Sequence, residues 1–438
     1  MTKKGRMVAM SRLFKIKTDE KLGERYYYLE HESGLPIYVF PKKMTLKTAL
    51  LGVKFGSVYE EGATVDGKQL CFPSGIAHFL EHKLFSNEDG VDAIEALAAV
   101  GADANAYTSN NKTVYMFSCT ENFGEALGGL IDFVCHPYFT KKNVNSEKGI
   151  ITQEIKMCND SPYDVVSQNL LLALYGDCAL SRDVLGTEKT IAKITDRCLT
   201  DCYNSFYRYS NMALVVCGDV DCDEVLRVVD KFLPEREKSS APTLPDIPSE
   251  AAVHTAYIEK IMPVSTPILE IGIKDEKPSA DTEVRLRRDV AMTVLDEMLF
   301  SRASDLYYSL FESGLINESY SYGYSITRDA AFHSIYAEST QPEKVLESVK
   351  KYVCDVRARG LDEGTFTRCK RVMLAEFIRD FDSVDDVANS LINFVFEGSD
   401  TFEYKKMIED LTFADVCECF DSSFGEDRYC LSVIKNKN

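Results

Sequence analysis

Runs of apolar residues mark the strands and helices expected in the first half of the chain. Short apolar stretches predict strands at 26–30, 36–40, 48–56 and 212–217, with a longer strand or hairpin at 104–119. Apolar residues three and four positions apart predict helices at 74–86, 91–100, 121–135, 140–158, 163–174 and 196–207. This mixture indicates an α+β fold, in which helices pack on one face of an antiparallel sheet.

Part of this pattern returns in the second half. Residues 191–220 align without gaps with residues 408–437, so that Thr195 meets Thr412 at the start of a predicted helix. Two amphipathic helices could share this pattern by chance, but the strand that follows is in register too. Further helices are expected at 280–300, 303–313, 341–358, 364–380 and 384–396. We therefore predict two homologous domains of the α+β class.

The boundary between the domains is expected in a segment rich in turn-forming residues. Arg236–Glu250 contains three prolines, three serines and no helical period, which is typical of a linker. The predicted organisation is an N-terminal domain at 1–235, a linker at 236–250 and a duplicated C-terminal domain at 251–438.

Composition and charge narrow the classes of partner. The chain has 438 residues, 45% hydrophobic and 27% charged, which is the balance of a globular protein. Lys and Arg number 50 and Asp and Glu number 69, so the formal net charge is −19. Such a surface disfavours nucleic acid and anionic membranes as partners, whereas basic peptides or metal cations would suit it.

Several features favour the cytoplasm. No stretch approaches the roughly 18 apolar residues of a membrane-spanning helix, and Met1–Lys21 has no apolar core of a signal peptide. The 14 cysteines are scattered and include no Cys-x-x-Cys pair. Reduced thiols are therefore expected, rather than disulfides or a thiolate metal site.

The main candidate for chemistry is SGIAHFLEHKLF, residues 74–85. His78 and His82 are four apart, so on a helix that starts at Ser74 both imidazoles project from one face and can share one Zn²⁺. Glu81 lies between them and can reach a water on that ion. The alternative is a surface helix with two solvated histidines, but Phe79 and other apolar neighbours make that alternative costly.

Two histidines do not complete a zinc site, which needs a third protein ligand. The best donors are Glu147 and Glu154, seven apart and therefore on one face of the helix predicted at 140–158. From spacing alone, they could equally be solvated helix carboxylates.

With this pair of motifs, the sequence resembles the pitrilysin/insulinase family of zinc metallopeptidases, whose members carry the inverted His-x-x-Glu-His motif of residues 78–82 and, later in the chain, a helix with two glutamates. The resemblance implies that Glu154 is the third ligand, that Glu147 lies near the metal, and that one Zn²⁺ binds per chain. It further implies domains that form a clamshell. The most similar members are expected to be half-length bacterial proteins, similar to subunits of mitochondrial processing peptidase.

The resemblance also suggests where a peptide would bind. Residues 101–119 look like a family strand that receives an extended substrate, which implies that Asn105 and Ala106 contact the substrate backbone. An ordinary hairpin with an Asn turn is the alternative.

The second half departs from the metal motif. Thr293 and Glu297 fall at the places of His78 and His82, so no second metal is expected and this half is assigned to structure and substrate binding. Active relatives use an arginine and a tyrosine from this half. Phe311 stands at the place of that arginine, whereas Tyr320 or Tyr322 could supply the tyrosine unless both only pack in a strand.

These observations predict a zinc-dependent metalloendopeptidase that hydrolyses short or unfolded peptides, with Glu81 as general base. By resemblance, the chain would act as a homodimer or as a heterodimer with a metal-free paralogue. Two alternatives remain: a non-catalytic or regulatory subunit, and a maturation factor dedicated to one protein or peptide.

Overall fold

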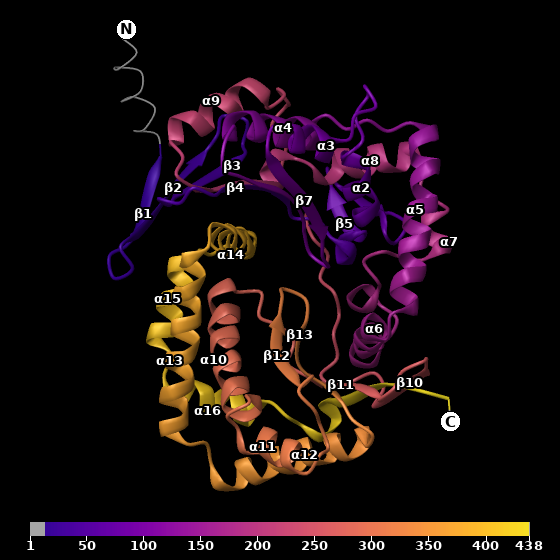
Figure 1. Cartoon of the computed structure of the whole chain (residues 1–438), viewed down its shortest axis with the longest axis vertical. Coiled ribbons are helices and arrows are strands. Elements are labelled where there is room, and N and C mark those ends of the chain that lie inside the picture. The colour runs from indigo at the N-terminus through magenta and orange to yellow at the C-terminus, as the bar shows by residue number, and fades with distance from the viewer. Residues whose placement is uncertain (1–13, 438) are drawn as a thin grey trace. The chain divides into compact units, whose positions relative to one another are not determined.

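The computed structural model describes residues 14–437. The chain forms two compact units, each assembled from separate stretches of sequence (Figure 1). Of the described residues, unit 1 contains 14–155, Arg182–Pro245 and Ile378–Phe402. Unit 2 contains Lys156–Ser181, Asp246–Phe377 and 403–437.

Unit 1 is built on a seven-stranded sheet with the order β1-β2-β3-β9-β4-β8-β7. Its strands are β1 (Lys15–Asp19), β2 (Glu24–Glu30), β3 (Pro36–Pro41), β4 (Lys47–Val53), β7 (Ala102–Thr108), β8 (Thr113–Cys119) and β9 (Met212–Gly218). Neighbouring strands are antiparallel except β3 and β9, which run parallel. The central strands β4 and β9 are nearly continuous apolar runs, as expected of strands that are covered on both faces.

Helices cover both faces of this sheet. They are α2 (Ile76–Leu84), α3 (Ala93–Ala99), α4 (Phe123–Cys135), the first part of α5 (Lys141–Asp160), α7 (Glu188–Ile191), α8 (Asp196–Phe206), α9 (Cys222–Phe232) and α14 (Val384–Glu397). Helix α4 packs on β4 and β8, and α14, from late in the chain, packs on β4 and β9. A side chain at Gly52 of β4 would begin 2.6 Å from Ile392 of α14, so the glycine permits this close approach. A small hairpin, β5 (Glu61–Val65) and β6 (Lys68–Cys71), completes unit 1.

Unit 2 repeats the arrangement around five strands in the order β10-β14-β11-β13-β12. The strands are β10 (Tyr257–Ile261), β11 (Ile268–Lys274), β12 (Ser321–Ile326), β13 (Ala331–Glu338) and β14 (Tyr429–Lys435). Only β10 and β14 are parallel. Its helices are α6 (Pro162–Tyr175), α10 (Thr282–Phe300), α11 (Asp305–Glu312), α12 (Pro342–Arg359), α13 (Glu363–Arg379), most of α15 (Thr401–Asp410), and α16 (Phe413–Ser422).

The predicted fold class is confirmed: both units combine an antiparallel-dominated sheet with helices. The predicted repeat between residues 191–220 and 408–437 corresponds to a helix followed by a strand in each unit. Thr195 and Thr412 cap helices α8 and α16, and each helix leads into a strand, β9 or β14. Helices were predicted on one face of each sheet. In the structure, α14 in unit 1 and α6 in unit 2 cover a second face as well.

The predicted halves and the compact units have different boundaries. Residues 156–181 fall within the predicted N-terminal domain but pack in unit 2, and residues 378–402 fall within the predicted C-terminal domain but pack in unit 1. Local sequence patterns do not report which sheet a helix will cover. The chain leaves unit 1 between Pro245 and Asp246, inside the predicted linker.

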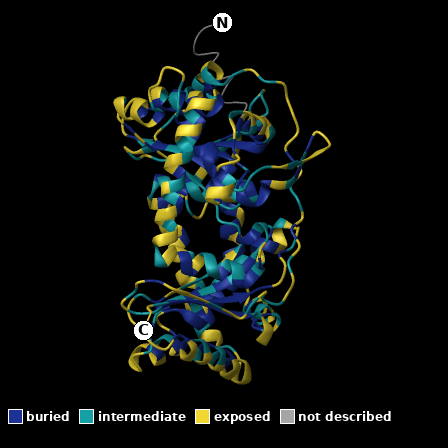
Figure 2. Cartoon of the chain, turned by 90° about the vertical axis from the view of Figure 1, so that its right-hand side faces the viewer, coloured by how far each residue is buried: buried dark blue, intermediate teal, exposed yellow. Residues whose placement is uncertain are grey.

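The strands at the centre of each sheet are buried (Figure 2). Among residues 14–437, no helix combines the length and apolar character needed to cross a membrane. All 14 cysteines lie in this range, and none of them forms a disulfide. The prediction made for Met1–Lys21 falls largely on residues 1–13, which lie outside the described residues.

Candidate metal centre

Helix α2 carries the His-Phe-Leu-Glu-His sequence, and its start is fixed by a distant carboxylate. The predicted cap, Ser74, is wrong: the helix begins after Gly75, whose φ of +89° is accessible mainly to glycine. Glu60 Oε1 accepts hydrogen bonds from the backbone N–H groups of Gly75 at 3.0 Å and Ala77 at 3.1 Å. Burial raises the pKa of Glu60 to about 8. Glu60, 15 residues before Gly75, thus accepts the hydrogen bonds that an N-cap side chain would accept at the start of α2.

The three predicted metal ligands lie together in unit 1. His78 and His82 of α2 and Glu154 of α5 each offer one ligand atom, and these atoms lie within 4.8 Å of one another. The two imidazole centroids are 4.6 Å apart, as expected of positions one helical turn apart. His78 is buried, whereas His82 and Glu154 are partly exposed. The cluster is therefore compact and open on one side.

The distances within this cluster fit a divalent ion better than direct hydrogen bonds. Glu154 Oε1 lies 3.6 Å from His78 Nε2, and Glu154 Oε2 lies 3.5 Å from His82 Nε2. Both separations are too long for good hydrogen bonds, but they approach the roughly 3.3 Å between two ligands of a tetrahedral zinc ion. Glu154 Oε2 is also buried without a hydrogen-bond partner. Such an atom is costly unless a cation meets it.

Burial and the nearby His82 lower the pKa of His78 to about 3. Its imidazole is therefore neutral at neutral pH, which is the form that binds metal. Two imidazoles and one carboxylate form a donor set that suits zinc, with a fourth position left for water or substrate. The residues of this cluster therefore fit a zinc ion.

Glu147 lies behind His82, on the side away from Glu154. Glu147 Oε1 is 3.1 Å from His82 Nδ1, so Nε2 is the nitrogen that faces the cluster. Glu147 Oε2 accepts a hydrogen bond from Lys83 Nζ at 3.1 Å. Burial alone would raise the pKa of Glu147, but His82 and Lys83 outweigh it and hold the pKa below its usual value. An ionised acceptor of this kind orients a ligating histidine.

Glu81 is buried beside the cluster and is held by the sheet. Its Oε2 accepts a hydrogen bond from Thr108 Oγ1, at the end of β7, at 2.6 Å. Burial raises the pKa of Glu81, and the bond from Thr108 opposes this rise only in part. A carboxyl whose pKa is raised toward neutrality suits the exchange of a proton with substrate or water.

Asn105 and Ala106 lie on β7, which is the last strand of the unit 1 sheet. One edge of β7 pairs with β8, and Asn105 is exposed. The backbone N–H of Ala106 donates to Oδ1 of Asn105 at 2.8 Å rather than to another strand. An edge strand can accept an added peptide strand, so the expected substrate contact stays a prediction with a suitable location.

Tyr320 and Tyr322 belong to unit 2, at the start of β12. The Tyr320 side chain is 2% exposed, and its hydroxyl donates to the Phe300 carbonyl at 2.8 Å. Tyr322 is half-buried, and its hydroxyl donates to Glu297. Phe311 is exposed and its ring stacks on Tyr307. Tyr322 is therefore more available to a ligand than Tyr320.

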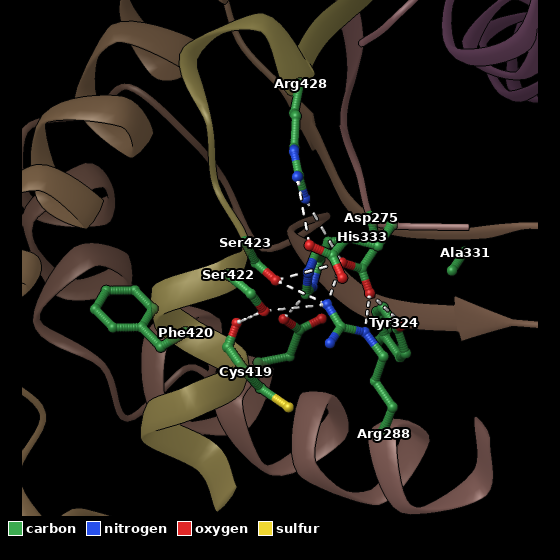
Figure 3. Close-up of polar contacts among 12 residues, drawn as sticks. Asp275, Arg288, Tyr324, Ala331, His333, Cys419, Phe420, Ser422, Ser423 and Arg428 are labelled. Atoms are coloured by element: carbon green, nitrogen blue, oxygen red, sulfur yellow. Dashed lines mark hydrogen bonds and ion pairs between the residues drawn. The ribbon is translucent and has the colours of Figure 1, made fainter. Parts of the chain in front are cut away.

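Among residues 14–437, the one group of histidine, cysteine and acidic side chains that could hold a metal ion is that of unit 1. Helix α10 carries Thr293, Asp296 and Glu297 in place of the His-x-x-Glu-His residues. Asp296 pairs with the buried His333 at 2.6 Å. Asp275 nearby accepts two hydrogen bonds from Arg288, at 2.8 and 2.6 Å (Figure 3).

Three residues with roles around the cluster were not found from the sequence. Glu60 was missed because its partner helix starts 15 positions later, and Thr108 because a hydroxyl in a strand carries no distinctive signal. Lys83 did offer a signal, since it is a cation beside the motif, directly after His82 and before the apolar residues Leu84 and Phe85. Its burial, at 2% exposure, shows that this signal had a structural cause.

Comparison with known families covers most of the chain. The family model described as Insulinase (Peptidase family M16) matches residues 44–188, which include the metal cluster. A second model, described as Peptidase M16 inactive domain, matches residues 193–373. His78, His82 and Glu154 thus lie in the range of the first model, and Thr293, Asp296 and Glu297 lie in the range of the second.

Relatives of similar length support the same assignment. The uncharacterized zinc protease YmfH of Bacillus subtilis (strain 168) is 32% identical over 96% of this chain and 98% of its own length. A probable mitochondrial-processing peptidase subunit beta of Arabidopsis thaliana is 27% identical over 59% of this chain and 47% of its own. A crystal structure from Alicyclobacillus acidocaldarius, described as M16-like peptidase, has a TM-score of 0.88 and 27% identity over 97% of this chain and 99% of its own. The chain belongs to the insulinase family of peptidases, family M16, as one of its half-length members.

Proposed function

We propose that the protein is a zinc-dependent metalloendopeptidase that cleaves short or unfolded peptides. The proposal is carried by the cluster of His78, His82 and Glu154, whose ligand atoms lie within 4.8 Å of one another. The family and the names of the relatives, several of them zinc proteases, support it. When bound, zinc would supply Lewis-acid chemistry, because it acidifies a water molecule and polarises a peptide carbonyl.

Glu81 is proposed as the general base and then the general acid. Thr108 holds Oε2 of this carboxylate, so we assign the proton transfer to Oε1. Oε1 would take the proton of the attacking water and pass it to the nitrogen of the leaving amine. Glu147 is proposed to orient His82 rather than to exchange protons, since both its oxygens are engaged by His82 and Lys83.

The substrate is proposed to bind as an added strand along β7. Main-chain groups near Asn105 and Ala106 would pair with the peptide, and this mode of binding requires an extended, unfolded substrate. Tyr322 is proposed to donate a hydrogen bond to the developing oxyanion. Tyr320 is the weaker candidate because its hydroxyl already serves the Phe300 carbonyl.

Glu81→Gln tests the mechanism separately from metal binding. The variant should keep the zinc content of the wild type but lose peptide hydrolysis by about 100-fold or more, because general acid–base catalysis contributes on that scale. Zinc would be measured by atomic absorption and cleavage with a fluorogenic peptide library, with and without a chelator. Glu376→Gln changes an exposed glutamate of unit 2 and is the matched control. Cleavage by Glu81→Gln at the wild-type rate would remove Glu81 from this role.

Assembly is proposed to be a homodimer or a heterodimer with a metal-free paralogue. The similarity to a subunit of a mitochondrial processing peptidase supports this possibility. A non-catalytic subunit is the second candidate function, since residues 193–373 match the model described as an inactive domain. Zinc binding without cleavage of any library peptide, alone or with a candidate partner chain, would favour that second candidate.

A further inference from the structure

Lys83 follows a predicted zinc ligand directly, yet its side chain is buried. It is 2% exposed and is among the largest fully buried side chains of the described residues. Its Nζ donates to Ser86 Oγ at 2.8 Å and to Glu147 Oε2 at 3.1 Å. The other oxygen of Glu147 lies 3.1 Å from Nδ1 of His82. Lys83, Glu147 and His82 are thus linked by consecutive polar contacts. The last of them, His82, belongs to the cluster with His78 and Glu154.

Stability alone does not explain a lysine at this position. Removing an ammonium group from water costs several kcal/mol, and a buried ion pair can often be replaced by apolar residues without loss of stability. Leu80 and Leu84, on the same helix, are fully buried apolar residues. Apolar residues at both positions 83 and 147 would therefore satisfy the packing, so the charged pair of Lys83 and Glu147 needs another explanation.

The position of Glu147 supplies that explanation. A carboxylate can rotate about its side-chain torsions, and His82 engages only one of its oxygens. Lys83 holds the other oxygen from a rigid helix, one residue beyond His82 itself. With both oxygens held, the His82 ring has a fixed acceptor on its Nδ1 side, and Nε2 is left facing Glu154.

We propose that Lys83 is a positioning residue of the metal centre, which fixes Glu147 so that His82 presents Nε2 to zinc. This inference rests on the proposed zinc site. Because Lys83 acts through Glu147, the contribution of Lys83 to zinc affinity should disappear when Glu147 is replaced and can no longer orient His82. The two residues should therefore be coupled in a double-mutant cycle.

The test is a cycle of Lys83→Met, Glu147→Gln and the double variant in the full chain. Zinc dissociation constants would be measured by competition with a chromophoric chelator. We expect each single change to weaken zinc binding by about 10-fold or more, as for partners that orient a ligating histidine. The double variant should bind zinc no more weakly than Glu147→Gln alone.

A second readout separates positioning from a structural role. Urea unfolding of the metal-free protein would report any loss of stability, and a purely structural role would change stability but leave the zinc affinity of the folded protein unchanged. Lys274→Met is the matched control, since Lys274 is a buried lysine of unit 2 that donates to the carbonyls of Leu174 and Ala252. This control should keep the wild-type zinc affinity.

Three outcomes would overturn the inference. One is a zinc affinity of Lys83→Met within twofold of the wild type, and another is a double variant in which the two losses multiply. If Lys83→Met does not fold, Lys83→Gln removes the charge, keeps a polar group and is judged by the same limits. In the third outcome the wild type binds no zinc, which would overturn the proposed function as well.

Discussion

The two units share an architecture but meet the cost of buried charge in different ways. Each has a mainly antiparallel sheet with one parallel pair, and in each a central glycine, Gly52 or Gly272, lies against a helix from the other half of the sequence. Unit 2 neutralises its buried acid Asp275 with Arg288 (Figure 3). In unit 1, Glu154 Oε2 is buried without a hydrogen-bond partner and Glu154 faces two histidines. The comparable oxygen of unit 2, Asp296 Oδ2, belongs to a carboxyl whose pKa is raised by burial and whose other oxygen pairs with His333.

This difference indicates how one fold could hold the proposed zinc ion in one copy and dispense with it in the other. Buried carboxylates require a counter-charge, which can be a side chain or an ion. Arg288 fills that role for Asp275 in unit 2, whereas burial raises the pKa of Asp296, which pairs with His333. Among residues 14–437, the ion pairs of Glu154 are with the two histidines of α2, and this arrangement suits an external cation.

The largest effect is expected from matched changes on α2 and α10. His82→Ala removes a proposed ligand, so zinc affinity should fall by more than the roughly 100-fold that loss of an outer partner can cost, and peptide cleavage should fall below detection. Glu297→Ala, at the corresponding place in unit 2, should leave zinc affinity unchanged, whereas its effect on cleavage would report on Tyr322, whose hydroxyl donates to Glu297. Zinc titration with the peptide assay would check this. Equal loss of zinc in both variants would break the comparison.

The second expected effect concerns the stability of unit 2. Arg288→Met removes the nearer of the two arginines at the buried carboxylate of Asp275 and leaves Arg428 at 3.9 Å, so the loss of unfolding free energy should approach the roughly 3–5 kcal/mol of a broken buried ion pair. Arg287→Ala, next to it, removes only an exposed ion pair with Glu283 and should cost less than about 0.5 kcal/mol. Urea denaturation would measure both. Zinc affinity should not change in either variant, and a loss of zinc in Arg288→Met would show that the units are not independent.

The direction of the pH dependence follows from the same ion pair. Arg288 outweighs the effect of burial and holds the pKa of Asp275 below its usual value. The ionised form is therefore favoured in the folded state, and this stabilisation is present above the ordinary pKa and lost as pH falls toward acid. In Arg288→Met, the free energy of unfolding should therefore fall less steeply than in the wild type as the pH is lowered.

The candidate site could be predicted where its residues are close in sequence. His78, Glu81 and His82 occupy one helix, so helical periodicity alone places them on neighbouring positions. Glu154, on a helix more than seventy residues away, required the family resemblance, because spacing leaves a lone glutamate ambiguous. Thr195 and Thr412 were predicted as caps because a cap and its helix are adjacent.

The parts that could not be predicted depend on long-range packing. Helices α6 and α14 were expected from their apolar periodicity, but the unit in which each packs depends on the shape of the sheet that receives it. Gly52 and Gly272 permit that packing, and a glycine in a strand does not reveal its partner in advance. Glu60 was missed for the same reason, since it caps a helix that it does not precede directly.

A smaller effect is expected from Thr108. In both units a hydroxyl on an edge strand donates to a buried carboxylate: Thr108 to Glu81 in unit 1 and Tyr324 to Asp275 in unit 2. Thr108→Val keeps the shape and removes the donor, so kcat should fall by about 10-fold, or about 1.4 kcal/mol, with KM and zinc content unchanged. Steady-state kinetics would check this.

Thr108→Ser is the control for that change, because it keeps the hydroxyl and should recover most of the activity. If Thr108→Val instead raised KM with kcat unchanged, the hydroxyl would serve substrate binding on β7 rather than the orientation of Glu81. That result would distinguish Thr108 from Tyr324, whose hydroxyl donates to Asp275, a residue to which we assign only a structural role.

The smallest effect is expected at the start of α2. Helix α10 of unit 2 is capped locally by Asp281, whereas α2 depends on the buried Glu60, whose pKa burial raises to about 8. Between the ordinary pKa of 4.5 and about 8, the folded state holds more protons at Glu60 than the unfolded state does. Stability contributed by this group is therefore lost as pH rises through that window.

Glu60→Gln should remove this pH dependence, because the amide oxygen can accept the same backbone hydrogen bonds without ionising. At pH 4.5, variant and wild type should differ by less than about 1 kcal/mol, as for a conservative change of a helix cap. Toward pH 8, the variant should become the more stable of the two. Urea unfolding of the metal-free protein across this range would measure the divergence. If the unfolding free energies of variant and wild type run parallel across this range, Glu60 is ionised throughout and stabilises α2 as a charged cap. Glu60 and Asp281 would then differ only in their distance along the chain from the helix that each one caps.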